Sequence, residues 1–432
     1  MNNTNEYLVR PLLDNDSINV EVPGSKSITN RSLLLAALGK GKCTLNGVLF
    51  SDDSRAFLNC LKELGFSLLI DEDNKKVTIE GTEGIIPNSS ATINVGSAGT
   101  AARFLTVFLA FAGGEYTLNA SPQMCKRPME PLINTLREAG VEITCTNEEG
   151  HFPFHMVAKG ITVTSMRSNT DVSSQFASAM LMAAPLLPNG LKVILEGGRV
   201  DGAYIKITLR MLEQFGFKYI KNGNVIDVMS KEQSHTDFYD IEPDVSAAGY
   251  FYAMSPICHK TVCVKGVHLD SMQGDIKFIL ALKELGCELT ETDYGLRIDP
   301  PSSESYKGID INMNDFSDQT MTMAVVSAFA SSPTTIHGIE HIRYQESDRL
   351  MAIINELTRL GIECHEIDNY DGIYINPGPM HAASIKTYED HRMAMSFALT
   401  GLKIPGVRIL NPGCCSKTFE NYFEVLDQIC IK

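Results

Sequence analysis

Two patterns recur at intervals of 70 to 76 residues and constrain the fold of this 432-residue chain more than any other feature. In the first pattern, an amphipathic helix ends on a glycine and leads into an alternating, strand-like run, and this arrangement occurs five times. A glycine just past the last helical turn readily adopts the left-handed conformation that closes a helix. The glycines of the five copies are Gly65, Gly140, Gly216, Gly286 and Gly361.

In the second pattern, a small or acidic residue that can cap a helix precedes a stretch rich in Ala, Met, Leu and Phe. Its six copies begin near Ser25, Ser97, Ser173, Asp244, Ser317 and Asp390. These helices are apolar on nearly all sides, which predicts that they are buried. Short strand-like runs bounded by Gly, Asn and Pro lie between the helices. The sequence therefore predicts a mixed α/β module of about seventy residues, repeated six times within globular domains rather than in a solenoid.

Length and composition agree with a globular protein of at least two domains, since 432 residues exceed one ordinary core. No apolar run is long enough to cross a bilayer, and the N-terminal segment lacks the pattern of a signal peptide. Eleven cysteines without CxxC pairs indicate reduced thiols, so we expect a cytoplasmic protein. A net charge of −15 argues against nucleic acid or an anionic membrane as the main partner, but leaves small anionic substrates open.

The segment Pro23–Arg31, PGSKSITNR, has the features of a helix start that binds an anion. A glycine allows close approach to the backbone, hydroxyl residues cap the first turn, and free amide groups face the ligand. Many helices begin in this way only to satisfy their own amides, so one copy alone is weak evidence. The other helix starts strengthen the interpretation, because reactive side chains gather beside them.

Cations and a few acids accumulate at these starts. Arginines and lysines beside several helix N-termini describe a site for small molecules that carry both carboxylate and phosphate. Acids within such a cationic pocket are candidates for proton transfer. Two structural readings stay open, since Asp390 could serve only to orient His391, and Asp348 only to pair with Arg349. The residues in question are Lys26, Arg31, Arg127, Asp318, Glu346, Arg349, Asp390, Arg392 and Lys417.

Other common chemistries lack their motifs. The sequence contains no GxxxxGK[ST] phosphate loop, no GxGxxG after a strand, no HExxH and no GxSxG. We therefore expect neither a nucleotide nor a metal cofactor.

Together the motifs resemble 5-enolpyruvylshikimate-3-phosphate synthase, and the resemblance covers essentially the whole chain. The motifs, in chain order, are PGSKSITNR, SAGTAARF, KRP, SSQ, SMQGD, ESDR, YEDHRMAM and SKTFENYF. The resemblance implies two domains, each of three βαβαββ-type modules around buried parallel helices. It places residues 1–23 with 244–432 in the first domain and residues 24–243 in the second. It also implies an active site in the cleft between the domains, and a monomer.

The resemblance implies a transferase of the shikimate pathway, which leads to the aromatic amino acids. Such an enzyme moves the enolpyruvyl group of phosphoenolpyruvate to the 5-hydroxyl of shikimate 3-phosphate and releases phosphate through a tetrahedral intermediate. Asp318 would accept the proton of the hydroxyl, Glu346 would protonate the methylene carbon, and Lys26 and Lys417 would act at the same centre. The residues implied to bind shikimate 3-phosphate are Lys26, Ser27, Arg31, Ser173, Ser174, Gln175, Tyr204, Asp318, His341 and Gln345. The residues implied to bind phosphoenolpyruvate are Lys26, Gly99, Arg127, Gln175, Arg349, Arg392 and Lys417.

Three departures from the family pattern fall in the expected pocket for the 3-phosphate. The chain has Asp201-Gly202-Ala203-Tyr204 where the family usually has Ser-(Lys/Arg)-Pro-Tyr. Gln345 replaces a lysine, and His341 replaces an asparagine. Loss of a cation and gain of a carboxylate disfavour phosphate, unless His341 is protonated and Asp201 points away from the phosphate.

Two alternatives to this function remain. One is a related transferase with another acceptor, such as UDP-N-acetylglucosamine. In that relative a nucleophilic cysteine lies several residues before the matching Arg-Pro, whereas Cys125 lies only two residues before Arg127. The other is a catalytically silent relative, against which the presence of Asp318, Glu346 and Lys417 argues.

Overall fold

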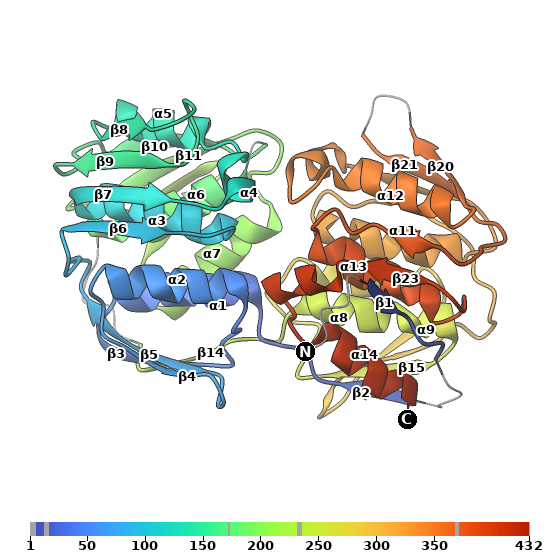
Figure 1. Cartoon of the computed structure of the whole chain (residues 1–432). Coiled ribbons are helices and arrows are strands. Elements are labelled where there is room, and N and C mark those ends of the chain that lie inside the picture. The colour runs from blue at the N-terminus through green and yellow to red at the C-terminus, as the bar shows by residue number, and fades with distance from the viewer. Residues whose placement is uncertain (1–5, 13–16, 172, 231–235, 368–370, 432) are drawn as a thin grey trace. The chain divides into compact units, whose positions relative to one another are not determined.

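The computed structural model describes residues 6–12, 17–171, 173–230, 236–367 and 371–431. The chain divides into two compact units, one formed by Met1–Pro23 with Glu242–Lys432 (unit 1) and the other by Gly24–Ile241 (unit 2). The second boundary thus follows Ile241, whereas the resemblance places it after Pro243. Figure 1 shows the helices and strands of both units.

Unit 2 contains three modules in which helices alternate with the strands of a small four-stranded sheet. The first module comprises α1 (Lys26–Leu38), β3 (Lys40–Asn46), α2 (Asp52–Glu63), β4 (Leu68–Asp71), β5 (Lys76–Thr82) and β14 (Phe238–Asp240). The second comprises β6 (Ser90–Asn94), α3 (Gly99–Ala112), β7 (Gly114–Asn119), α4 (Pro122–Cys125), α5 (Glu130–Glu138), β8 (Glu142–Cys145) and β9 (Phe154–Ala158). The third comprises β10 (Ser165–Asn169), α6 (Ser174–Ala183), η1 (Ala184–Leu186), β11 (Leu191–Glu196), α7 (Ala203–Gln214), β12 (Tyr219–Asn222) and β13 (Val225–Val228).

Unit 1 repeats the same plan three times, with a shorter third sheet. Its first module comprises β2 (Ser17–Val20), α8 (Val245–Tyr252), α9 (Met254–Cys258), β15 (Thr261–Lys265), α10 (Ile276–Ala281), β16 (Glu288–Glu291) and β17 (Gly295–Asp299). The second comprises β18 (Asp310–Asn312), η2 (Ser317–Gln319), α11 (Thr320–Ala328), β19 (Thr334–His337), η3 (Glu340–Tyr344), α12 (Arg349–Arg359), β20 (Glu363–Glu366) and β21 (Ile373–Asn376). The third comprises β1 (Glu6–Leu8), β22 (Ser384–Ile385), α13 (His391–Gly401), β23 (Arg408–Leu410), η5 (Pro412–Lys417) and α14 (Tyr422–Ile431).

Each four-stranded sheet has the same order of pairing, in which one parallel pair is followed by two antiparallel pairs. In two modules the parallel partner comes from a distant part of the chain. Strand β2 pairs with β15, with Ile18 opposite Val262, and in Figure 1 the blue β2 lies beside β15. Strand β14 pairs with β3, with Phe238 opposite Thr44. The expected six-fold repeat of α/β modules is therefore confirmed.

The helices of the second pattern form the cores, as their apolar sequences predict. Helix α3 is buried from Gly99 to Phe111, and it packs against α6 within unit 2. In unit 1, α11 packs against α13, and the buried hydroxyls of Thr322 and Ser396 lie 3.1 Å apart between these two helices. Because the cores are filled by the middle of each helix, the polar residues at the helix starts remain at one end of each core.

The two sequence patterns differ in how well they place the helix ends. All five repeat glycines have positive φ angles, between 81° and 96°, which confirms their role after the helices. At two starts of the second pattern the α-helix begins a few residues after the expected position. Helix α3 follows Ala98 rather than Ser97, and α11 begins only at Thr320, because Ser317 lies in the 3-10 turn η2 and its hydroxyl pairs with His341 instead.

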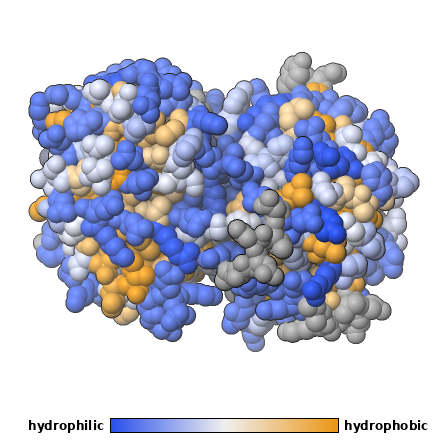
Figure 2. Space-filling view, in the orientation of Figure 1, coloured by the Kyte–Doolittle hydropathy of each residue, from blue (hydrophilic) through white to orange (hydrophobic). Residues whose placement is uncertain are grey.

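Most of the surface drawn in Figure 2 is hydrophilic, and a hydrophobic area covers part of the β3–β5 sheet of unit 2. Leu69 on β4 and Ile85 after β5 are each more than 70% exposed. All eleven cysteines are free thiols. Among the described residues, no helix is both long enough and apolar enough to cross a membrane.

Candidate active site

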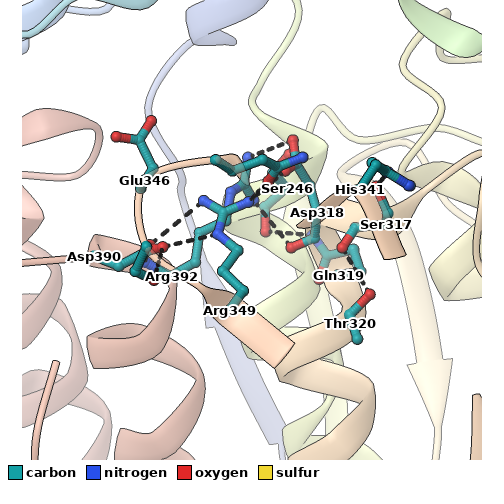
Figure 3. A network of polar contacts seen from close by, with 12 residues as sticks. Ser246, Ser317, Asp318, Gln319, Thr320, His341, Glu346, Arg349, Asp390 and Arg392 are labelled. Carbon is teal, nitrogen blue, oxygen red and sulfur yellow. Dashed lines mark hydrogen bonds and ion pairs between the residues drawn. The ribbon is translucent and has the colours of Figure 1, made fainter. Parts of the chain in front are cut away.

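In unit 1, Asp318 lies between two arginines that the sequence analysis assigned to substrate binding. Its carboxylate accepts a hydrogen bond from Nη1 of Arg349 at 2.9 Å and from Nη2 of Arg392 at 3.0 Å (Figure 3). Asp318 comes from η2, Arg349 from the first turn of α12 and Arg392 from the first turn of α13. Three helix starts of unit 1 therefore bring together an acid and two cations.

Asp390 contacts the side chain of Arg349 and the backbone of Arg392. Its fully buried carboxylate accepts from Nε of Arg349 at 2.8 Å and from the backbone amide of Arg392 at 2.9 Å. The second contact makes Asp390 the N-cap of α13. The sequence analysis left Asp390 either as a candidate for proton transfer or as a residue that only orients His391. Its described hydrogen bonds are with Arg349 and Arg392. Its nearest approach to His391 is 3.9 Å, to Nδ1.

The two acids keep Arg349 charged despite its burial. Burial by itself lowers the pKa of a guanidinium group, but Asp390 and Asp318 outweigh it and raise the pKa of Arg349. Asp348 accepts from the amide of Met351 and caps α12, and it also lies 3.5 Å from Arg343. The expected alternative, in which Asp348 only pairs with Arg349, therefore receives no support from these contacts.

The two unit 1 departures from the family pattern lie in the same network. The side-chain oxygen of Gln345 accepts a hydrogen bond from Nη1 of Arg349, so the glutamine helps to hold the guanidinium group in place. His341 Nε2 and the hydroxyl of Ser317 lie 2.7 Å apart. Ser317 in turn precedes Asp318 in the same 3-10 turn.

Glu346 and Lys417 form a second pair in unit 1. Nζ of Lys417 lies 2.5 Å from Oε2 of Glu346, and both side chains are about nine-tenths buried. Lys417 ends η5, and Glu346 lies between η3 and α12. Glu346, the expected proton donor, lies on the loop that leads from Gln345 to Arg349. Lys417 places a cation beside it.

Asp275 is an acid that the sequence analysis did not assign, although it ends the motif SMQGD. Its buried carboxyl accepts a hydrogen bond from Ser246, whose carbonyl accepts from Nε2 of Gln319 at 3.0 Å. Burial and the neighbouring Asp318 raise the pKa of Asp275 to about 7, against a smaller opposite effect of Arg392. Spacing alone could not reveal this residue, because it precedes α10 and lies outside the six helix starts of the second pattern.

In unit 2, Arg31 is a fully buried cation surrounded by neutral groups. Its guanidinium donates to Oγ1 of Thr208 at 2.9 Å, to the carbonyl of Ser27 at 3.0 Å and to Oγ of Ser178 at 3.2 Å. It also lies over the rings of Phe104 and Tyr204. Burial lowers the pKa of Arg31 to about 10, so the residue stays charged at neutral pH. Within the described part of the chain no carboxylate forms an ion pair with Arg31, and such an environment suits an anionic ligand.

The start of α3 brings two more arginines together. A Cβ at Gly99 would lie 2.5 Å from Nη1 of Arg103 and 2.7 Å from Nη1 of Arg127, so both guanidinium groups approach this glycine closely and would have to shift to admit a side chain. Nη1 of Arg103 also donates to the side-chain oxygen of Gln175 at 2.9 Å. Gly99, Arg127 and Gln175, which the sequence analysis assigned to one phosphate, therefore lie in a single group. Arg103, one of the cations that the sequence places beside this helix start, links the three.

Lys26, the first residue of α1, has an acidic partner that the sequence analysis missed. Its Nζ lies 3.6 Å from Oδ2 of Asp53, a buried residue at the start of α2. The adjacent Ser27 contributes its carbonyl to Arg31. Burial of an aspartate next to a lysine at a helix start was the missing signal, and burial is not visible in the sequence.

Ser173 and Ser174 begin α6, and Tyr204 lies in the first turn of α7. The hydroxyl of Ser173 accepts from the amide of Gln175 at 3.2 Å, and the hydroxyl of Ser178 lies 3.5 Å from the carbonyl of Tyr204. Asp201, the departure on this loop, forms an ion pair with Lys221 on β12, which lowers the pKa of Asp201. The local charge of this carboxylate is therefore balanced within unit 2.

The candidate residues fall into two groups, one in each unit. Unit 1 contains Asp318, His341, Gln345, Glu346, Arg349, Arg392 and Lys417, and unit 2 contains Lys26, Ser27, Arg31, Gly99, Arg127, Ser173, Ser174, Gln175 and Tyr204. Among the described residues, no three His, Cys, Asp or Glu side chains are grouped so that they could hold a metal ion.

The six-module fold, with cations and acids collected at its helix starts, is that of a transferase acting on small molecules. More specifically, residues 16–426 match the family EPSP synthase (3-phosphoshikimate 1-carboxyvinyltransferase), and the chain belongs to this family. It is 40% identical to the 3-phosphoshikimate 1-carboxyvinyltransferase of Nostoc punctiforme, over 94% of each chain. It is 35% identical to the chloroplastic enzyme of Brassica napus, over 98% of this chain and 85% of the relative. The solved EPSP synthase of Acinetobacter baumannii superposes with a TM-score of 0.82 at 25% identity, and the match covers 99% of this chain and 98% of that one. The resemblance inferred from the motifs is thus confirmed.

Proposed function

We propose that this chain transfers the enolpyruvyl group of phosphoenolpyruvate to the 5-hydroxyl of shikimate 3-phosphate and releases phosphate. The observation that carries the proposal is the contact of Asp318 with both Arg349 and Arg392. Two guanidinium groups favour the ionised carboxylate, which is the form that accepts a proton. The same arginines carry the charge that a substrate carboxylate requires.

Asp318 takes the proton of the 5-hydroxyl as its oxygen bonds to C2 of phosphoenolpyruvate. Glu346 donates a proton to the methylene carbon in the same step, which gives a tetrahedral intermediate. When the bond from C2 to the phosphate oxygen breaks, the methyl group returns a proton to Glu346 and the double bond forms again. The proton taken up by Asp318 passes to the departing phosphate, which restores both acids. Lys417, next to Glu346, and Lys26 stabilise the negative charge on the departing phosphate.

The residues of unit 2 hold the rest of the two substrates in this proposal. Ser27 and Arg31 bind the carboxylate of the acceptor, since Arg31 is a buried cation whose described contacts are all neutral. Ser173 and Ser174 bind its 3-phosphate, with Tyr204 nearby. Gly99, Arg127 and Gln175 receive the phosphate of phosphoenolpyruvate, for which the paired guanidinium groups at Gly99 provide the charge.

We further infer that the enzyme acts as a cytoplasmic monomer and needs no cofactor, since the proposed chemistry uses only acids, cations and amides of the chain. Its partners are the two anionic substrates. The net charge of −15 disfavours nucleic acid or an anionic membrane as a partner.

The test is phosphate release from phosphoenolpyruvate with one acceptor at a time. Shikimate 3-phosphate, shikimate and UDP-N-acetylglucosamine are supplied separately to the purified protein. We expect release with shikimate 3-phosphate, weak release with shikimate and none with UDP-N-acetylglucosamine. Preference for another acceptor would contradict the acceptor assignment but keep that of the donor. Absence of release with every acceptor would favour the silent relative.

A further inference from the structure

The loop between β11 and α7 carries an arginine that the family resemblance did not assign. Its position matters because the neighbouring Gly202 stands where the family pattern has a lysine or arginine. Asp201 brings a negative charge instead, which is balanced by its ion pair with Lys221. The proposed phosphate pocket of unit 2 therefore needs a cation from elsewhere, and Arg199 lies on the same loop.

The described contacts of Arg199 place it beside the segment that leads into α6. Its backbone amide donates to Oγ1 of Thr170 at 3.3 Å, and Nη2 of its guanidinium donates to the carbonyl of Asp171 at 2.7 Å. Asp171 is two residues before Ser173, the N-cap of α6. The side chain of Arg199 thus reaches from the start of α7 toward the start of α6.

Hydrogen bonds hold the backbone of this loop, so the position from which the Arg199 side chain extends is fixed. The amide of Gly202 donates to the carbonyl of Arg199 at 3.0 Å, which forms a turn directly before α7. The carboxylate of Asp171 accepts from the amide of Gly198 at 2.8 Å. Among its described contacts the guanidinium uses one of its five N–H groups on a backbone carbonyl, which leaves the positive charge available to a ligand at the same place.

The half-buried position of Arg199 increases what this charge can contribute. Burial lowers the pKa of Arg199, and Asp171 opposes this effect. A guanidinium that has already lost part of its hydration gains more from an anion than an exposed one does. A phosphate with its oxygens directed at the amides of α6 would also benefit from the positive end of that helix.

We propose that Arg199 is a specificity-determining residue, which supplies the 3-phosphate of the acceptor with the positive partner that Gly202 and Gln345 do not supply. This inference rests on the proposed function, because it names the group on the substrate that Arg199 recognises. It predicts a preference for the phosphorylated acceptor over the same molecule without its phosphate. A role of Arg199 that was only structural would affect both acceptors alike.

The experiment measures binding by calorimetry, with two ligands and three variants of the full chain. Shikimate 3-phosphate and shikimate are titrated into the wild type, Arg199→Ala, Arg199→Lys and the matched control Arg210→Ala, in which an exposed arginine of α7 is removed. We expect Arg199→Ala to weaken the binding of shikimate 3-phosphate by about 10- to 100-fold and to change the affinity for shikimate by less than about twofold. Arg199→Lys should recover part of the loss, and the control should match the wild type.

Two other results would overturn the inference. Equal weakening of both ligands in Arg199→Ala would assign Arg199 to the structure of the loop, and unchanged affinity for shikimate 3-phosphate would remove it from the pocket. Turnover of the wild type with shikimate 3-phosphate is measured in parallel. If the wild type turns over and only the Arg199 effect is missing, the inference alone fails. If the wild type neither binds nor converts shikimate 3-phosphate, the proposed function fails together with the inference.

Discussion

Arg349 and Glu356 lie seven residues apart on one face of α12, and they contact the two ends of one turn, residues 386–390, which leads into α13. Arg349 contacts Asp390 at the end of the turn. The fully buried Glu356 accepts from the backbone amide of Lys386 at 3.0 Å and from the hydroxyl of Tyr388 at 2.8 Å, at its beginning. Within the turn, Tyr388 and Glu389 both have positive φ angles, 55° and 58°, which side-chain-bearing residues seldom adopt. The arrangement that orients Asp390 therefore depends on a buried glutamate.

Replacement of Glu356 should destabilise unit 1. Glu356→Ala leaves a cavity at a fully buried position and removes the acceptor of the Lys386 amide and the Tyr388 hydroxyl, so we expect the free energy of unfolding to fall by about 2–4 kcal/mol. Glu356→Gln keeps one oxygen acceptor and should cost about half as much. Urea denaturation measures both, with Glu424→Ala on the exposed side of α14 as the control. Equal stability of Glu356→Ala and the control would contradict the role of this turn.

The second prediction concerns Asp318. Asp318→Asn removes the proton acceptor but keeps the volume of the side chain, so turnover should fall by about 10²- to 10⁴-fold. Two buried arginines also lose an anionic partner, and the free energy of unfolding should fall by about 1–3 kcal/mol. Turnover is expressed per folded molecule, with the exposed Asp310→Asn as the control. Loss of stability with normal turnover would make Asp318 a structural residue.

The repeat and the types of residue beside the helix starts could be predicted because local rules determine them. A glycine after a helix is a property of the backbone, and the five repeat glycines follow it. Ser97 and Ser317 do not cap α3 and α11, although serine is a good capping residue. Ser317 turns its hydroxyl to His341, a residue 24 positions away, and no local rule contains that contact.

The parts of the site that the sequence did not predict depend on tertiary contacts, which no local rule contains either. The roles of Asp53 and Asp275 depend on their burial beside Lys26 and Asp318, which come from other elements. Asp201 looked unfavourable for a phosphate because Lys221, on a strand twenty residues later, could not be assigned to it from spacing. Charge balance in a site depends on these pairs, so sequence counts of acids and bases predict it poorly.

The third prediction concerns the pH dependence of stability through Asp275. Its pKa is raised to about 7 in the folded chain, by burial and by Asp318, while an unfolded aspartate titrates near 4. The folded state therefore holds a proton that the unfolded state has lost between these values, and the stability contributed by this group is full below about pH 4 and is lost as the pH rises to about 7. Above this range the contribution stays constant. Asp244, Asp318, Arg392 and Ser246 are the groups that face this carboxyl.

The variant Asp275→Asn removes this titration while it keeps the size of the side chain. Relative to the wild type, its free energy of unfolding should increase between pH 4.5 and 8 by on the order of 2–4 kcal/mol. Urea denaturation at several pH values gives the two curves, and Asp293→Asn, at an exposed position, is the control. Curves that stay parallel over the whole range would show that Asp275 does not hold the proton.

The last prediction uses Gln345, where the family pattern has a lysine. Its side-chain oxygen accepts from Arg349, which also contacts Asp318 and Asp390, so a change of charge at this position acts directly on the arginine. Gln345→Glu adds a third carboxylate to Arg349 and should leave stability nearly unchanged. It should raise KM for phosphoenolpyruvate by about tenfold, because the new charge opposes the substrate carboxylate. Gln345→Lys offers no acceptor and places a cation against Arg349, so it should lower the free energy of unfolding by about 1–2 kcal/mol. Steady-state kinetics and urea denaturation of both variants separate the two effects, with the exposed Gln428→Glu on α14 as the control. An unchanged KM in Gln345→Glu would mean that Arg349 does not bind the carboxylate of the donor.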